Sequence, residues 1–266
     1  MLARVAKQIT PGLVLVAIAL LLVSGPVGAT PRASAGGSAP VSAALPALAP
    51  GAVTIELCAS AGVAALTGST SVSIWGFSLW NGSTCDPAQL PGPVLEVVAG
   101  DDVTIILHNV LSEAVALSFP GQAMVPDTTG AASGSTATYA FRADHPGAYL
   151  YEAGLNTDIQ LPMGLYGALI VRPTTPLQGY DDPSPAYGTE TILVLSEFDL
   201  DPAADDGPEY WLINGKAYPN TSNITAPAGR LLLRYLNAGS DHYTMALLGL
   251  HQRVIAKDAY QVPYQF

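Results

Sequence analysis

The chain has 266 residues and a formal net charge of −11, with charged residues at only 12% of positions and with 26 glycines and 22 prolines. An acidic chain with ten lysines and arginines offers no basic surface to phosphate backbones, which excludes nucleic acid as a partner. Abundant glycine and proline, with few helix signals, indicate short strands joined by turns.

The N-terminal residues 1–29 read as a signal peptide. Arg4 and Lys7 precede an apolar run, residues 13–23, and a stretch of small residues ends at Ala29. This order predicts secretion and cleavage after Ala29. The alternative is an uncleaved anchor, but the run is about half of the ~20 residues that span a bilayer. No second candidate span follows, so we expect an extracytoplasmic protein with no membrane span after cleavage.

Composition divides the remaining chain into four parts. An Ala/Pro/Ser-rich stretch is expected to be an extended linker, and a Pro- and Asp-rich connector separates two segments with strand patterns. The expected organisation is a linker at 30–50, a first domain at 51–173, the connector at 174–190 and a second domain at 191–266.

The only two cysteines are Cys58 and Cys85. In an exported chain they predict one disulfide, which would contribute about 3 to 4 kcal/mol in the chain-entropy model. The alternative is a copper-thiolate ligand, which would need histidine partners. No histidine lies close to either cysteine in the sequence.

Apolar alternation predicts strands throughout both domains, because side chains on a strand alternate between faces. Many short strands separated by turn signals favour β-sandwiches over βαβ units. The predicted strand segments in the first domain are 94–110 with a turn at Gly100, 136–143, a strand with Tyr149 and Tyr151 that opens residues 147–171, and 164–171. Those in the second domain are 191–198, 210–215, 230–239 and 251–258.

Four segments of the chain, in this order, resemble the multicopper oxidase family. "LPGPVLEVVAGDDVTIILHNVL" is similar to the opening of that family's first cupredoxin domain, and "HPGAYLYEAG…GLYGALIVRP" to its last strands. "YWLINGKAYPN" and the residues after it, as far as "VIAKDA", resemble the start of the second domain. The resemblance covers residues 90–266 apart from the connector. It implies an all-β fold of tandem cupredoxin-like, plastocyanin-like Greek-key β-sandwiches, the second of them incomplete.

The resemblance also implies where copper ligands would stand. In the family the first domain supplies two His-X-His pairs to a trinuclear copper cluster. The matching positions here carry no imidazole: Ser118, Pro120, Glu152 and Gly154. A register slipped by one residue would place Leu117 and Phe119 at the first pair instead. Because copper in such clusters is held by neutral imidazoles, we predict no catalytic residue, no metal ligand and no cofactor in this chain. Copper and oxidoreductase activity are implied by the family only.

The chain's few histidines lack ligand spacing. No His-X-His or His-Cys pattern occurs, so these residues are weak metal candidates: His108, His145, His242 and His251. Three Asn-X-Ser/Thr sequons also occur, at Asn81, Asn220 and Asn223.

Glu152 needs an explanation if copper is absent. We hypothesise that Glu152, Ser118 and either Tyr149 or Tyr151 form a polar plug at the former copper position. A buried carboxylate needs a partner, for which the sequence offers Arg142 or Arg172.

Three functions remain open on the sequence. The first is an exported protein of multicopper-oxidase ancestry whose first domain is copper-free and acts as a scaffold or interaction domain. The second is the N-terminal part of a copper-dependent oxidoreductase whose working copper lies beyond residue 266, which would make a further C-terminal cupredoxin domain the partner. The third is copper binding through an unrecognised site.

Overall fold

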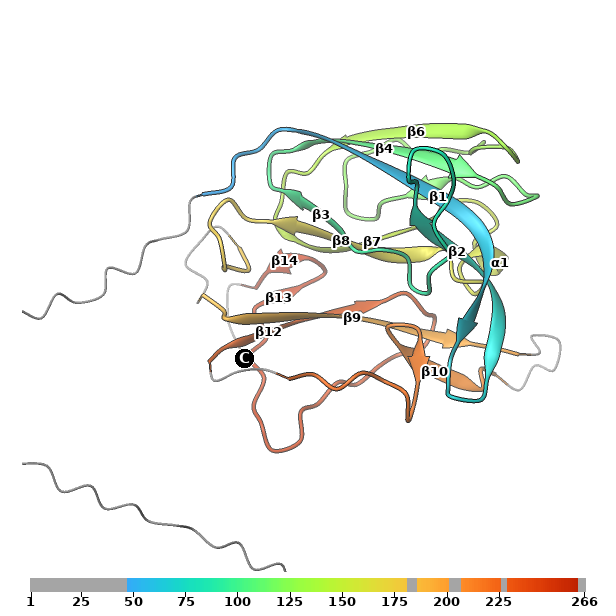
Figure 1. Cartoon of the computed structure of the whole chain (residues 1–266). Coiled ribbons are helices and arrows are strands. Elements are labelled where there is room, and N and C mark those ends of the chain that lie inside the picture. The colour runs from blue at the N-terminus through green and yellow to red at the C-terminus, as the bar shows by residue number, and fades with distance from the viewer. Residues whose placement is uncertain (1–46, 181–185, 201–206, 226–228, 263–266) are drawn as a thin grey trace, which may run out of the picture. The chain divides into compact units, whose positions relative to one another are not determined.

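The computed structural model describes residues 47–180, 186–200, 207–225 and 229–262 (Figure 1). The predicted signal peptide and most of the 30–50 linker lie outside these residues. Within them the only helix is the single turn α1 (Thr157–Gln160), and no helix is long and apolar enough to cross a membrane. The predicted all-β class is confirmed.

Sheet I has the strand order β2-β1-β4-β6. Its strands are β2 (Ser71–Leu79), β1 (Ala52–Ala65), β4 (Asp102–Asn109) and β6 (Thr136–Arg142). β1 runs parallel to β4, and the other neighbours are antiparallel. Alternate β4 side chains are buried, as the predicted period-2 pattern requires.

Sheet II has the order β3-β8-β7-β5. It contains β3 (Leu95–Val98), β8 (Tyr166–Arg172), β7 (Gly147–Ala153) and β5 (Leu117–Ser118). Sheets I and II face each other across the main apolar core, whose large buried members include Leu57, Phe77, Ile105, Leu107, Leu117, Tyr151 and Leu169. Together they form the first sandwich.

Sheet III has the order β11-β10-β9-β12. Its strands are β11 (Lys216–Ala217), β10 (Tyr210–Ile213), β9 (Thr189–Phe198) and β12 (Leu231–Asn237). A short hairpin, β13 (Ala256–Lys257) with β14 (Tyr260–Gln261), follows it.

Strand β8 is buried on both faces, as its uninterrupted apolar run predicts. Leu169 and Val171 lie in the main core, whereas Tyr166, Ala168 and Ile170 form a second cluster with residues of sheet III, namely Val194 and Leu236. β8 is therefore the layer that joins the first sandwich to sheet III.

The β1–β2 hairpin also contacts sheet III. Leu66, Val72 and Ile74 near its tip pack against the buried Leu212 and Phe198. Backbone bonding reinforces this packing, because the amide of Ala217 donates to the carbonyl of Leu66 at 2.9 Å. Neither β1 nor β2 was among the strands predicted from the sequence.

Every predicted strand segment contains a strand, but in 251–258 the strand covers only two residues. There the structure forms only β13, and residues 251–255 are irregular. The prediction for those five residues is wrong, because an alternating pattern yields a strand only where a neighbour pairs with it. Within the described residues, the one backbone bond from this stretch to a neighbouring segment is at Ile255, whose carbonyl accepts the amide of Val262 at 3.0 Å, and a single bond does not make a strand.

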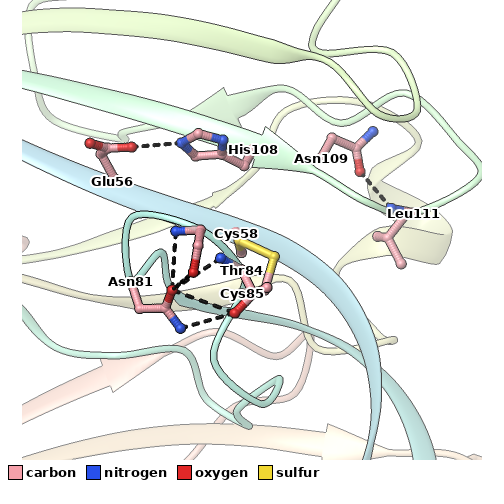
Figure 2. Close-up of a disulfide and its surroundings, with 9 residues drawn as sticks. Glu56, Cys58, Asn81, Thr84, Cys85, His108, Asn109 and Leu111 are labelled. Atoms are coloured by element: carbon pink, nitrogen blue, oxygen red, sulfur yellow. Dashed lines mark hydrogen bonds and ion pairs between the residues drawn. A yellow bond between two sulfur atoms is a disulfide. The ribbon is translucent and has the colours of Figure 1, made fainter.

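The predicted disulfide is confirmed. Cys58 and Cys85 are bonded, with Cα atoms 5.6 Å apart (Figure 2). The alternative of a copper-thiolate ligand is therefore wrong. The bond ties the loop after β2 onto the outer face of sheet I.

Gly215 provides a test of the contact between sheet III and the first sandwich. A Cβ at this residue would lie 1.9 Å from the carbonyl oxygen of Leu90, and its φ is +71°. We expect Gly215→Ala to lower the free energy of unfolding by several kcal/mol, because both the backbone conformation and the contact are violated. Equilibrium denaturation measures the change.

Gly134→Ala is the matched control. Gly134 has φ +73°, and nothing lies within 4 Å of its Cβ position, so only the conformational cost of about 1 to 2 kcal/mol applies. Equal losses in the two variants would contradict the close contact with Leu90.

Candidate functional site

Ser118, Glu152 and Tyr166 form a row across three strands of sheet II. Ser118 on β5 pairs with Glu152 on β7, and Glu152 pairs with Tyr166 on β8. Leu117 and Ala153, their chain neighbours, are buried in the main core. Because side chains alternate along a strand, the row lies on the opposite face of sheet II, the face that packs against sheet III.

Tyr149 and Tyr151 do not belong to this row. Both lie in the main core, where the Tyr151 hydroxyl donates to the carbonyl of Pro93 at 2.7 Å and the Tyr149 hydroxyl to that of His145 at 2.9 Å. Burial raises the pKa of Tyr149 to about 12. The predicted plug is therefore wrong in its tyrosines, which point to the other face, whereas the pairing of Ser118 with Glu152 is observed.

Glu152 is half-buried, and burial raises the pKa of its carboxyl above the ordinary value. No hydrogen bond or ion pair to its side chain occurs in the described ranges. Both arginines predicted as its partners are engaged elsewhere. Arg142 pairs with Asp102 and Asp144, and Arg172 with Glu96 and Glu190. The predicted pairing of Glu152 with an arginine is wrong.

Tyr166 continues the row into sheet III. Its hydroxyl donates to Oγ of Ser196 at 2.8 Å in a buried setting. Burial raises the pKa of Tyr166 to about 12 although the bond to Ser196 opposes the shift, and the nearby Glu197 raises it further. Tyr166 is thus held neutral, as a hydrogen-bond donor between the two sheets. Sequence reasoning missed this pair, although the alternation of Tyr166, Ala168 and Ile170 along one strand could have indicated a shared face.

The other two positions aligned with family ligands lie at strand ends. Pro120 and Gly154 are exposed, and the backbone amide of Gly154 donates to the carbonyl of Ala116 at 2.8 Å. In the slipped register the ligand positions would fall on Leu117 and Phe119, whose side chains lie in the main core.

The donors at these positions do not fit copper. Family clusters are held by neutral imidazole nitrogens, which suit an ion that cycles between Cu(I) and Cu(II). Ser118 offers a hydroxyl and Glu152 one carboxylate, whereas Pro120 and Gly154 have no side-chain donor. Neither register supplies an imidazole, so no chemical step can be assigned to copper on these residues.

His108 lies on the outer face of sheet I, beside the disulfide. Its Nε2 lies 2.7 Å from Oε2 of Glu56, as Figure 2 shows. Its ring stacks on Trp80, with centroids 4.1 Å apart and an interplanar angle of 7°. One ring nitrogen and one ring face are therefore already occupied by protein groups, an arrangement that anchors the strand end and that the sequence did not indicate.

The other histidines are exposed and separate. His145 lies in the turn before β7, with its ring 5.9 Å from that of Tyr260, while His242 and His251 lie in the segment after β12. Across the part of the chain that the structure describes, no three His, Cys, Asp or Glu side chains gather in a geometry that could hold a metal ion.

A chain of ion pairs links sheets II and III near the connector. Arg172 on β8 pairs with Glu96 at 3.0 Å and also with Glu190 on β9, and Glu190 pairs with Arg234 on β12 at 2.7 Å. Burial alone would raise the pKa of Glu190, but the hydrogen bonds and charges of Arg234 and Arg172 outweigh it and hold that pKa below its ordinary 4.5. Sequence reasoning did not predict this network.

Comparison with known proteins agrees with this architecture. Residues 84–176 match the family model "Multicopper oxidase". The copper-containing nitrite reductase of Neisseria meningitidis serogroup B is 28% identical over 166 residues, which are 57% of this chain and 43% of that enzyme. L-ascorbate oxidase of Cucurbita pepo var. melopepo is 37% identical over 121 residues, 41% of this chain and 21% of that enzyme.

Among solved structures, the blue copper oxidase from Nitrosomonas europaea superposes with a TM-score of 0.65 at 26% identity, over 81% of this chain and 70% of that one. The structure therefore belongs to the class of cupredoxin-fold proteins, and it contains the Cys58–Cys85 disulfide. Residues 84–176 therefore resemble a multicopper oxidase domain, and the chain spans less than half the length of the curated relatives named above.

The ion-pair network makes a prediction about acid stability. Glu190→Gln is expected to cost about 3 to 5 kcal/mol at neutral pH, because it leaves the buried Arg234 without a carboxylate. Since the folded-state pKa of Glu190 is depressed, its contribution is full above its ordinary pKa and is lost as pH falls through the folded-state pKa. Denaturation across the acid range measures both effects.

Glu96→Gln is the control for this prediction. The Glu96 side chain is 54% exposed, so removing its charge should cost less than about 1 kcal/mol. If the two variants lost equal stability, or if Glu190→Gln kept the acid dependence of the parent, the network would not act as described.

The carboxylate of Glu152 should affect stability in the opposite direction to that of Glu190. Because its folded-state pKa is raised, the charged form costs stability, fully so above that pKa and not at all below the ordinary value of 4.5. Glu152→Gln should therefore raise the melting temperature at neutral pH, and the gain should disappear in acid. A loss of stability at neutral pH would show instead that the carboxylate has a stabilising partner.

Proposed function

We propose that this chain is an exported protein of multicopper-oxidase ancestry whose first sandwich is copper-free and acts as a scaffold or interaction domain. The observation that carries the proposal is the donor set at the aligned ligand positions: a hydroxyl, a carboxylate and two residues without a side-chain donor. The third sequence hypothesis, copper bound at an unrecognised site, finds no support in the scattered histidines.

A scaffold role agrees with how the first sandwich is stabilised. Its core is apolar and closed between two sheets, and a disulfide ties the loop after β2 to β1. The apolar side chains buried between sheets I and II stabilise the fold without the help of a metal. The domain therefore keeps its shape, and hence its surfaces for a protein partner, in the absence of copper.

Export is supported by two features of the chain. The basic residues and apolar run at its start have the order of a secretory signal. The Cys58–Cys85 disulfide suits an oxidising compartment outside the cytoplasm.

A second candidate is the N-terminal part of a copper-dependent oxidoreductase with its working copper beyond residue 266. The greater length of the relatives favours this candidate, because the matched part of this chain covers only 43% of the N. meningitidis enzyme. In that case the partner of the first sandwich would be a further cupredoxin domain of the same protein, and the scaffold would position it.

Copper content tests the proposal. The purified chain, loaded with copper and desalted, should retain almost none by mass spectrometry and give no protein-bound EPR signal. Its melting temperature should not change with a chelator. One or more tightly held coppers per chain would overturn the copper-free assignment, and His108, His145, His242 and His251 would be the first residues to replace.

A gain-of-ligand variant supplies the positive control. Replacing Ser118, Pro120, Glu152 and Gly154 with histidine places an imidazole at each aligned position, and a Cβ at Gly154 meets its nearest neighbour at an ordinary 3.5 Å. This variant should retain copper where the parent does not. Copper retained by the variant and not by the parent would support the alignment of these positions with the family's ligand positions.

A further inference from the structure

The chain contains two Asn-Gly dipeptides, Asn81-Gly82 and Asn214-Gly215. In this dipeptide the backbone nitrogen of glycine can attack the side-chain amide carbon of asparagine, because glycine has no Cβ to obstruct the approach. Whether the reaction occurs depends on how the fold holds the two groups, since ring closure needs the nitrogen and the carbon to meet at a reactive angle. The fold treats the two dipeptides differently.

Asn81 and Gly82 are exposed and lie shortly before Cys85 in the chain. Figure 2 shows Asn81 close to Cys85. Gly82 has φ +92°, and nothing lies within 4 Å of the position where its Cβ would stand. The described structure offers no hydrogen-bond acceptor to its backbone N–H. The nucleophile is therefore accessible to water.

The Asn81 side-chain oxygen is surrounded by donors. Its Oδ1 accepts the backbone amides of Ser83 at 3.1 Å and Thr84 at 3.0 Å, and also the Ser83 hydroxyl at 3.0 Å. Donors aimed at a carbonyl oxygen stabilise the negative charge that develops there when a nucleophile adds to its carbon. The amide nitrogen is held only by the Thr84 hydroxyl, at 3.0 Å.

The Asn214 side chain is bonded to a neighbouring strand, whereas the side-chain bonds of Asn81 all stay within its own loop. Its Oδ1 accepts the amide of Val194 at 2.8 Å, and its Nδ2 donates to the carbonyl of Ile192 at 3.0 Å. Gly215 packs directly against the carbonyl of Leu90. Ring closure there would break both bonds to β9 and move a backbone that has no room.

We propose that Asn81 is a site of spontaneous deamidation in the folded protein and that Asn214 is protected. The backbone nitrogen of Gly82 bonds to Cγ of Asn81, the Cγ–Nδ2 bond breaks, and ammonia leaves with the proton from Gly82. Water then opens the five-membered imide at either carbonyl, which yields aspartate or isoaspartate at position 81.

The product changes the loop beside the disulfide. The donor to the Thr84 hydroxyl is lost, a negative charge appears, and the isoaspartate form lengthens the backbone between Trp80 and Cys85. The same reaction removes the Asn81 sequon, so an aged molecule can no longer be glycosylated there.

The test compares the two dipeptides within one molecule. The purified, oxidised chain is incubated at mildly alkaline pH, and isoaspartate is quantified by carboxyl-methyltransferase labelling and by peptide mass spectrometry. We expect at least about tenfold faster conversion at Asn81 than at Asn214, equivalent to a barrier difference of about 1.4 kcal/mol. Asn81→Gln should abolish the fast phase and leave the slow one.

The reduced, denatured chain is the control for intrinsic reactivity. Without the fold, the two dipeptides should react at similar rates. If their ratio in the folded protein equals that in the denatured chain, or if folded Asn81 reacts no faster than Asn214, the fold does not select Asn81, and the proposal is overturned.

Discussion

The double burial of β8 is the constraint on which the rest of this structure depends. One set of its side chains completes the core between sheets I and II, and the alternate set packs against sheet III. A strand covered on both faces cannot shift by one residue, because a shift would exchange the two sets. The registers of β3 and β7, which both pair with β8, follow from that restriction.

The same restriction determines the chemistry of the aligned ligand positions. With β7 in register against β8, the tyrosines of β7 enter the core and Glu152 lies on the face toward sheet III. A carboxylate in that position is desolvated without a charged partner, whereas Tyr166 beside it finds Ser196 across the sheets. The row is polar, and the Tyr166 hydroxyl has a hydrogen-bond partner whereas the Glu152 carboxylate has none among the described residues. The row contains no nitrogen donor that would suit copper.

Charge in the interior is concentrated at the other end of sheet II. Glu190 lies between two arginines from different strands, and the network joins sheets II and III where the connector leaves β8. A buried ion chain of this kind contributes little net free energy compared with apolar packing, but breaking it leaves a charge uncompensated. Its effect is therefore to favour one arrangement of the two sheets over others.

The amino-acid sequence by itself determined the all-β class, most of the longer strands after residue 94, the disulfide and the absence of imidazole at the aligned positions. These features depend on period-2 alternation, turn residues and residue identity, which are local properties. The pairing of Ser118 with Glu152 followed from the family resemblance.

Only the tertiary structure decided which groups meet across strands. The partners of Arg142 and Arg172, the face of Tyr149 and Tyr151, the His108–Glu56–Trp80 cluster and the irregular course of 251–255 all depend on register and on neighbours distant in sequence. Residue identity states what a side chain can bind. Register between strands that are far apart in the chain decides what lies within its reach.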